Sequence, residues 1–110
     1  MEKTQALDVF AALGQGTRLD VFRLLVKAGP DGLNAGQISE TLGVRPNTLS
    51  ANLAILLNSR LVRNKRDGRL IRYYAEMGTM QALVGFLLED CCGGAPEKCR
   101  PLLDEIAIAG

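Results

Sequence analysis

The stretch NAGQISETLGVRPNTLSANLAILLNS, residues 34–59, decides the fold of this chain. Its first part predicts a short helix that begins after Asn34, a residue suited to the N-cap position, and runs to about Leu42. Ile38 lies one helical turn before Leu42, so both side chains fall on the same face. Gly43 then has the residue type that ends helices in a left-handed backbone conformation.

A second short helix is predicted after only Val44 and Arg45. Pro46 is suited to its first position, because the N–H that proline lacks would be unbonded there in any case. We expect this helix to reach about Ser59 and to present one apolar stripe, made by Leu49, Leu53 and Leu56. Two short helices joined by a tight turn that contains glycine are typical of a helix-turn-helix, although many helical bundles also contain such a pair.

The residues that follow predict a β-hairpin with a concentrated positive charge. Leu61–Arg66 and Arg69–Ala75 alternate in character as strands do, and Asp67-Gly68 between them is a strong hairpin turn signal. The whole chain has a net charge of only +1. Residues 60–72 nevertheless hold a single acid and six cations, which are Arg60, Arg63, Lys65, Arg66, Arg69 and Arg72. Such a basic stripe is typical of anion contact, and a solubilising surface hairpin would show the same pattern.

Two helices are predicted before this unit and one after it. The first spans about Thr4–Leu13 and is stopped by Gly14; its apolar face consists of Leu7, Phe10, Ala11 and Leu13. The second runs from an expected N-cap at Thr17 to about Ala28. Its inward residues are expected to be Leu19, Phe22, Leu25 and Val26. The last helix spans about Thr79–Asp90, with apolar positions Met80, Leu83, Val84, Leu87 and Leu88.

Length and composition restrict the class of protein. The chain has 110 residues, of which 47% are hydrophobic and 23% charged, and this fits one soluble domain. No apolar run approaches the ~18 residues of a membrane span, and the N-terminus lacks the features of a signal peptide, so we expect a cytoplasmic protein. Histidine is absent, which excludes catalytic triads and imidazole metal ligands. We therefore expect neither an enzyme nor an organic cofactor.

The order of elements resembles that of the ArsR/SmtB family of metal-responsive repressors. The matching segments are Ala12–Leu19, Pro46–Leu56, Arg60–Val62 and Arg66–Tyr74, so the resemblance covers about residues 4–90. It implies a mainly α-helical fold with a small β-hairpin (α+β), a winged helix-turn-helix, in a homodimer held by the first and last helices. It also implies a repressor that binds double-stranded operator DNA. We expect a DNA-binding and dimerisation domain at residues 1–90 and a sensor tail at residues 91–110.

The DNA contacts are predicted on the second helix of the pair and on the hairpin. A recognition helix needs short polar side chains on its outer face to reach base edges in the major groove. Residues with that chemistry are Asn47, Thr48, Ser50 and Asn52, the last facing partly inward. At the hairpin tip, phosphate or minor-groove contacts are predicted for Lys65, Arg66 and Arg69. Smaller contributions are expected from Arg60, Arg63 and Arg72, which could pair with acids of their own protomer.

The metal ligands depart from two patterns of the family. Some members carry a cysteine pair on the third helix, where this chain has QISETL at residues 37–42. Others use Asp and His ligands on the last helix, and this chain has no histidine. The remaining candidate is a C-terminal cluster, Cys91, Cys92 and Cys99, which looks like the arsenic-sensing branch.

Three thiolates without a fourth ligand suit As(III) or Sb(III), and we predict that this metalloid releases the operator. Structural Zn(II) almost always takes four ligands, whereas softness alone does not exclude Cd(II), Pb(II) or Hg(II). A disulfide between Cys99 and Cys91 or Cys92 would instead make the chain a thiol redox sensor. A structural zinc tail and a thiol enzyme are further alternatives. The site could lie within one protomer or be shared by two.

Overall fold

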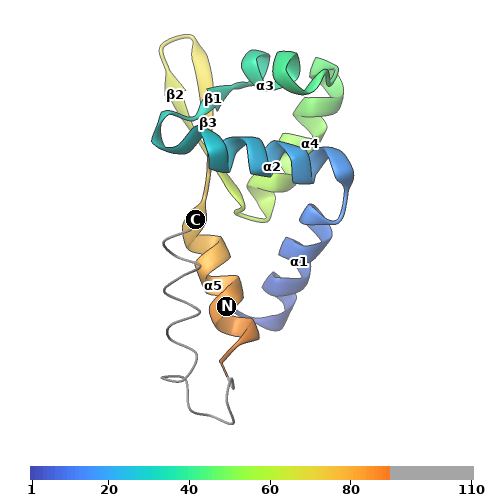
Figure 1. Ribbon diagram of the computed structural model, residues 1–110, viewed down its shortest axis with the longest axis vertical. Coiled ribbons are helices and arrows are strands. Elements are labelled where there is room, and N and C mark those ends of the chain that lie inside the picture. The colour runs from blue at the N-terminus through green and yellow to red at the C-terminus, as the bar shows by residue number, and fades with distance from the viewer. Residues whose placement is uncertain (90–110) are drawn as a thin grey trace.

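The computed structural model describes residues 1–89 (Figure 1). In chain order these residues form α1 (Lys3–Leu13), α2 (Gly16–Ala28), the 3₁₀ helix η1 (Gly29–Asp31), β1 (Leu33–Asn34), α3 (Ala35–Leu42), α4 (Pro46–Asn58), β2 (Val62–Asp67), β3 (Leu70–Ala75) and α5 (Met77–Leu87). Figure 1 shows α2, α3, α4 and the sheet grouped as one body, with α1 and α5 both extending away from it. The fold is a winged helix-turn-helix, mainly helical with a small sheet, as the sequence predicts.

The helix-turn-helix forms where its local signals place it. The Asn34 side chain accepts from the Gln37 N–H at 2.9 Å, and the Gln37 side chain accepts from the Asn34 N–H at 2.9 Å. This reciprocal capping box fixes the start of α3. Gly43 ends α3 at a φ of 66°, in the left-handed region that glycine adopts at little cost. Pro46 is the first residue of α4, so both helix boundaries of the turn are confirmed.

The sheet has three antiparallel strands in the order β1-β3-β2. The hairpin of β2 and β3 is confirmed, but β1 is not foreseen by the sequence. This strand contains only Leu33 and Asn34, which pair with Tyr73 and Arg72. A strand of this length has no periodicity to detect, and its position follows from the pairing with β3.

The hairpin turn lies one residue later than predicted. Asp67 pairs with Leu70 and is the last residue of β2, so Gly68 and Arg69 form the turn. Gly68 has a φ of 65°. Glycine at the first central position is typical of a type II′ turn, which suits the twist of the two strands.

The core lies at the junction of the helices with the first residues of the hairpin. Its buried members are Ala6, Val9, Ala12, Val21, Phe22, Leu25, Ile38, Leu49, Leu53, Leu56, Leu61, Val62 and Leu83. The leucine stripe predicted for α4 belongs to this set. Burial of this stripe determines which side of α4 faces the core and which side stays exposed to solvent.

The predicted apolar face of α1 is not its core face. α1 buries Ala6, Val9 and Ala12, whereas Leu7 and Phe10 are 57% and 45% exposed. Both sets recur at helical spacing, so periodicity cannot choose between them. The small side chains of α1 therefore face the core, and the larger apolar ones are left on the outside.

The start of α2 also differs from the prediction. Gln15, and not Thr17, is the N-cap, because the Gln15 side chain accepts from the Arg18 N–H at 2.9 Å. Leu19 is 42% exposed, and Val21 lies in the core beside the predicted Phe22 and Leu25.

Helix α5 begins before the predicted Thr79. Glu76 caps it by accepting from the Gly78 N–H at 3.3 Å. The helix ends at Leu87, and the predicted end at Asp90 lies outside the described residues. Leu83 is the buried residue of α5, while Leu87 is 55% exposed. Within residues 1–89, none of the helices is long and apolar enough to cross a membrane.

Candidate nucleic-acid interface

The outer face of α4 carries short polar side chains near its N-terminus. Asn47, Thr48 and Ser50 are all exposed, as predicted for contacts in a DNA groove. The Asn47 side chain accepts from the Thr48 N–H at 3.0 Å, which ties Asn47 to the first turn of the helix. Leu49 and Leu53 anchor the opposite side of the helix in the core. α4 therefore presents hydroxyl groups to solvent from a helix whose rotation is fixed by packing.

Asn52 does not belong to this outer face. It is only 8% exposed, and its Oδ1 accepts a hydrogen bond from Nη1 of Arg18 at 3.1 Å. The amide oxygen, which a bidentate contact with adenine would require, is therefore already used within the protein. The predicted base contact of Asn52 therefore does not fit the structure, and this residue has an internal role instead.

Two cations of the hairpin are paired with acids of the same chain. Nε of Arg63 lies 3.6 Å from Oε2 of Glu76. Nε of Arg72 lies 3.2 Å from Oδ2 of Asp67. Both pairs agree with the expectation that these arginines contribute less to an external anion site.

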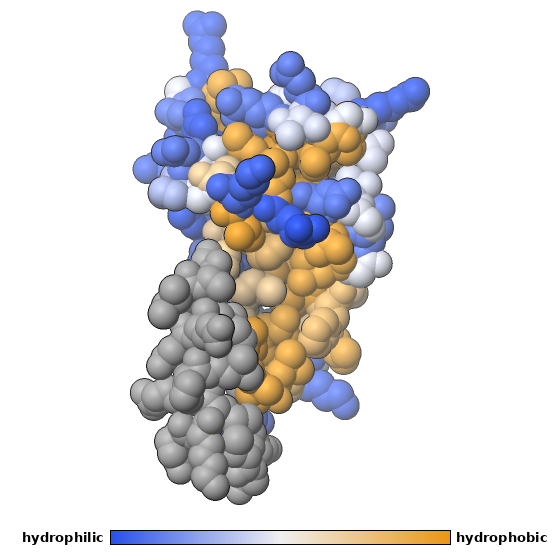
Figure 2. Space-filling view, in the orientation of Figure 1, coloured by the Kyte–Doolittle hydropathy of each residue, from blue (hydrophilic) through white to orange (hydrophobic). Residues whose placement is uncertain are grey.

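The cations at the tip of the hairpin are arranged differently. Lys65, Arg66 and Arg69 are exposed. In the part of the chain that the structure describes, the ion pairs are those of Arg63 and Arg72, so the three tip residues keep their charge for an external partner. Figure 2 shows hydrophilic side chains gathered over the upper end of the molecule, where the hairpin and α3 lie in Figure 1.

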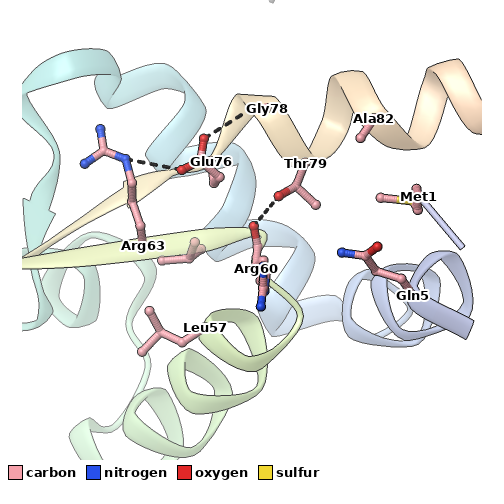
Figure 3. A pocket seen from close by; sticks show the side chains of 10 residues that line it. Met1, Gln5, Leu57, Arg60, Arg63, Glu76, Gly78, Thr79 and Ala82 are labelled. Atoms are coloured by element: carbon pink, nitrogen blue, oxygen red, sulfur yellow. Dashed lines mark hydrogen bonds and ion pairs between the residues drawn. The ribbon is translucent and has the colours of Figure 1, made fainter.

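Arg60 lies at the opposite end of β2 from the tip, roughly 20 Å along the strand at the usual rise per residue. Its φ is 63°, the left-handed region, and its carbonyl oxygen accepts from Oγ1 of Thr79 at 2.6 Å. Arg60 lines a cavity of about 530 Å³ together with Met1, Gln5 and Ala82. Figure 3 shows these side chains. This position sets Arg60 apart from the tip cations.

A second surface of interest is apolar. Leu7 and Phe10 on α1 and Leu87 on α5 are exposed at 57%, 45% and 55%. Figure 2 shows hydrophobic surface over the lower part of the molecule, where α1 lies. Large apolar side chains gathered on elements that extend from the body are typical of a protein interface.

The predicted metalloid ligands Cys91, Cys92 and Cys99 lie outside the described residues. Among residues 1–89, no group of three or more His, Cys, Asp or Glu side chains is placed to hold a metal ion.

Comparisons with known proteins agree on the fold. A model of a helix-turn-helix domain matches residues 13–64. No curated protein sequence matches the chain. An ArsR-like transcriptional regulator from Rhodococcus sp. RHA1 superposes with a TM-score of 0.70 at 27% identity, over 96% of this chain and 93% of that one.

Two further solved structures are similar. The homodimeric winged helix-turn-helix DNA-binding domain of a possible ArsR-family regulator from Mycobacterium bovis gives a TM-score of 0.64 at 29% identity, over 79% of this chain and 81% of that one. The antimony-specific transcriptional repressor AntR gives a TM-score of 0.62 at 27% identity, over 79% of this chain and 78% of that one.

Proposed function

We propose that the chain is a repressor of the ArsR/SmtB family that binds operator DNA as a homodimer and leaves it when As(III) or Sb(III) binds. The helix-turn-helix match and the ArsR-like neighbours support a DNA-binding transcriptional regulator of this family. The observation that carries the DNA-binding part is the pairing of an exposed polar face on α4 with three exposed cations at the hairpin tip.

In this proposal α4 enters the major groove and the hairpin follows the backbone. The Thr48 and Ser50 hydroxyls can donate to or accept from base edges and phosphate oxygens. Lys65, Arg66 and Arg69 would bind phosphate or the adjacent minor groove. Phosphate contacts fix the position of the protein on the duplex, and base contacts supply the sequence preference.

The dimer is supported by the apolar surface of α1 and α5. A twofold arrangement through these helices would cover Leu7, Phe10 and Leu87, which one protomer leaves exposed. The similar domain from Mycobacterium bovis is homodimeric. A twofold dimer presents two recognition helices, and it binds two half-sites about 34–36 Å apart when they occupy successive major grooves.

Selection from a random pool of duplexes with the purified full chain tests the DNA-binding part. We expect enrichment of a site with twofold symmetry. Ser50→Ala and Thr48→Ala should alter the preference at one position of each half-site, whereas Arg23→Ala on the exposed side of α2 should not. Recovery of unrelated sequences only would contradict the proposal.

The inducer site is proposed on chemical grounds. Cys91, Cys92 and Cys99 are three soft ligands within nine residues of a chain without histidine. A neighbour of similar fold is antimony-specific. Coupling of about 1–3 kcal/mol between metalloid and operator would weaken DNA binding about 5–150-fold, and by linkage DNA would weaken metalloid binding equally.

Native mass spectrometry of the fully reduced chain, with and without arsenite and with zinc as a control, tests this site. We expect one arsenic per protomer with loss of three thiol protons. Cys91→Ser, Cys92→Ser and Cys99→Ser should each keep DNA binding and abolish release by arsenite. Release by mild oxidant and not by arsenite would overturn the metalloid assignment and favour a thiol redox sensor.

A further inference from the structure

Arg18 joins three helices through one side chain. It lies on α2 and is half-buried. Its Nε donates to the Ala12 carbonyl at 2.7 Å, and its Nη2 donates to the Ala11 carbonyl at 3.4 Å. Its Nη1 donates to Oδ1 of Asn52 at 3.1 Å. The guanidinium group therefore bonds the end of α1 and the buried side of α4 at once.

The acceptors on α1 explain why an arginine is suited to this position. The last carbonyls of a helix have no partner within the helix and form the negative end of its dipole. Arg18 supplies a donor to the Ala12 carbonyl and a second donor to the Ala11 carbonyl, which also accepts from the Gly14 N–H at 3.3 Å. Its positive charge offsets the negative end of the dipole. Arginine presents several donors in a rigid planar fork, whereas lysine offers one compact charge. A lysine at position 18 would keep the charge but not bond Ala12 and Asn52 in this geometry.

Beside Arg18 the two helices are separated by a hollow. A cavity of about 360 Å³ lies between α1 and α4, lined among others by Asp8, Arg18, Ile55 and Asn58. Ile55, which faces it from α4, is 41% exposed. Arg18 lines this hollow and bonds both helices, so its hydrogen bonds contribute to the separation of α1 and α4 there, beside the packing of each helix on α2.

We propose that Arg18 is a positioning residue for DNA recognition, acting through Asn52 to fix the orientation of α4 relative to α1. The inference rests on the proposed function, in which α1 joins the two protomers and α4 reads the operator. In such a dimer the two recognition helices are connected through Arg18 and α1 of one protomer and through the same helix and arginine of its partner. A tilt of α4 on α1 changes the separation of the two recognition helices, so it weakens binding to a two-half-site operator more than binding to unrelated DNA.

Arg18→Gln tests the proposal, with Arg23→Gln as the matched control. Arg23 lies on the same helix, is exposed and loses the same charge. The affinity of each variant is measured for the duplex selected by the unaltered chain and for an unrelated duplex of equal length. We expect the ratio of the two affinities to fall by about tenfold or more for Arg18→Gln, comparable to one mismatched base pair in the whole operator. It should stay within about twofold for Arg23→Gln, whose loss of charge affects both duplexes alike.

Substitutions at Asn52 separate positioning from direct phosphate contact by Arg18. Asn52→Leu removes the acceptor while keeping the branching and the number of side-chain heavy atoms, and Asn52→Asp keeps an acceptor for Nη1. We expect Asn52→Leu to lower the ratio as Arg18→Gln does, and Asn52→Asp to keep it. Arg18→Lys should behave like Arg18→Gln although the charge is kept.

Equal ratios for Asn52→Leu and Asn52→Asp would overturn the inference, even if Arg18→Gln failed to fold. The inference would also be overturned if a folded Arg18→Gln variant showed the same ratio of affinities for the selected and the unrelated duplex as Arg23→Gln. If the unaltered chain selects no sequence at all, it is the proposed DNA-binding function that fails, and this result is distinct from both others.

Discussion

The salt dependence of DNA binding follows directly from the charges of the hairpin. Of its cations, Arg63 and Arg72 are engaged with acids at 3.6 and 3.2 Å. The tip residues Lys65, Arg66 and Arg69 are exposed. We predict that replacing the three tip residues together by alanine removes most of the electrostatic part of DNA binding.

The magnitude can be worked out from counterion release. Three tip cations in each protomer give about six phosphate contacts in a dimer, and each contact contributes about −0.9 to the slope of log K against log salt concentration. The hairpins alone therefore supply a slope of about −5, which weakens binding about 10³-fold between 50 and 200 mM salt. Arg66→Ala removes two contacts per dimer and should make the slope less negative by about 1.8.

Fluorescence anisotropy with any B-form duplex of about 30 base pairs measures this term, because it does not depend on the operator sequence. Arg63→Gln is the matched control, since it removes one charge from the same hairpin at a site already paired with Glu76. A slope that changes as much for Arg63→Gln as for Arg66→Ala would refute the assignment of the DNA contact to the tip.

Three further predictions concern the fold and the assembly. Gly32→Ala should lower the thermal stability far more than Gly43→Ala. Both glycines have a positive φ, so both substitutions strain the backbone. A Cβ on Gly32 would in addition lie 2.5 Å from the Tyr73 carbonyl oxygen, whereas a Cβ on Gly43 would meet nothing within 4 Å. We expect about 1–2 kcal/mol for Gly43→Ala from backbone strain alone, and equal losses would contradict the close contact of Gly32 with β3. Leu56→Ala, at a side chain with no exposure, should lower the free energy of unfolding in urea by about 2–5 kcal/mol, and a loss below 1 kcal/mol would place Leu56 outside the core. Phe10→Ser should raise the dimer dissociation constant measured by sedimentation without loss of helical signal, because this side chain is 45% exposed in one protomer, and an unchanged constant would argue against α1 as a dimer helix.

The elements with strong local signals could be predicted from the sequence. Asn34, Gly43 and Pro46 each have a residue type that one helix position favours, and the structure places them at the N-cap, the C-cap and the first position. The hairpin was predicted from its turn residues, with an error of one position. In both cases the determining interactions lie within a few residues along the chain, so a local pattern contains the necessary information.

The elements that depend on tertiary contacts could not be predicted in the same way. β1 forms only because β3 lies beside it. On α1 the larger apolar residues suggested a core face, but the structure buries the smaller Ala6, Val9 and Ala12. Asn52 has the residue type of a base-contacting side chain, and only the position of Arg18 in space shows that it is bonded internally. The sequence separation between Arg18 and Asn52 hides this pairing from any local pattern.

The two unexpected features of α1 belong to one arrangement. Its small residues lie in the core, and its C-terminal carbonyls accept hydrogen bonds from the guanidinium group of Arg18. Its larger residues, Leu7 and Phe10, are left exposed, and in the proposed dimer they face the second protomer. A helix that packs in the core on one side and, in the proposed dimer, against a partner on another side needs apolar residues on both. This double requirement explains why periodicity alone assigned its core face wrongly. It also means that a rearrangement of α1 would reach α4 by two routes, through Arg18 and through the core that the buried residues of α1 share with the leucines of α4.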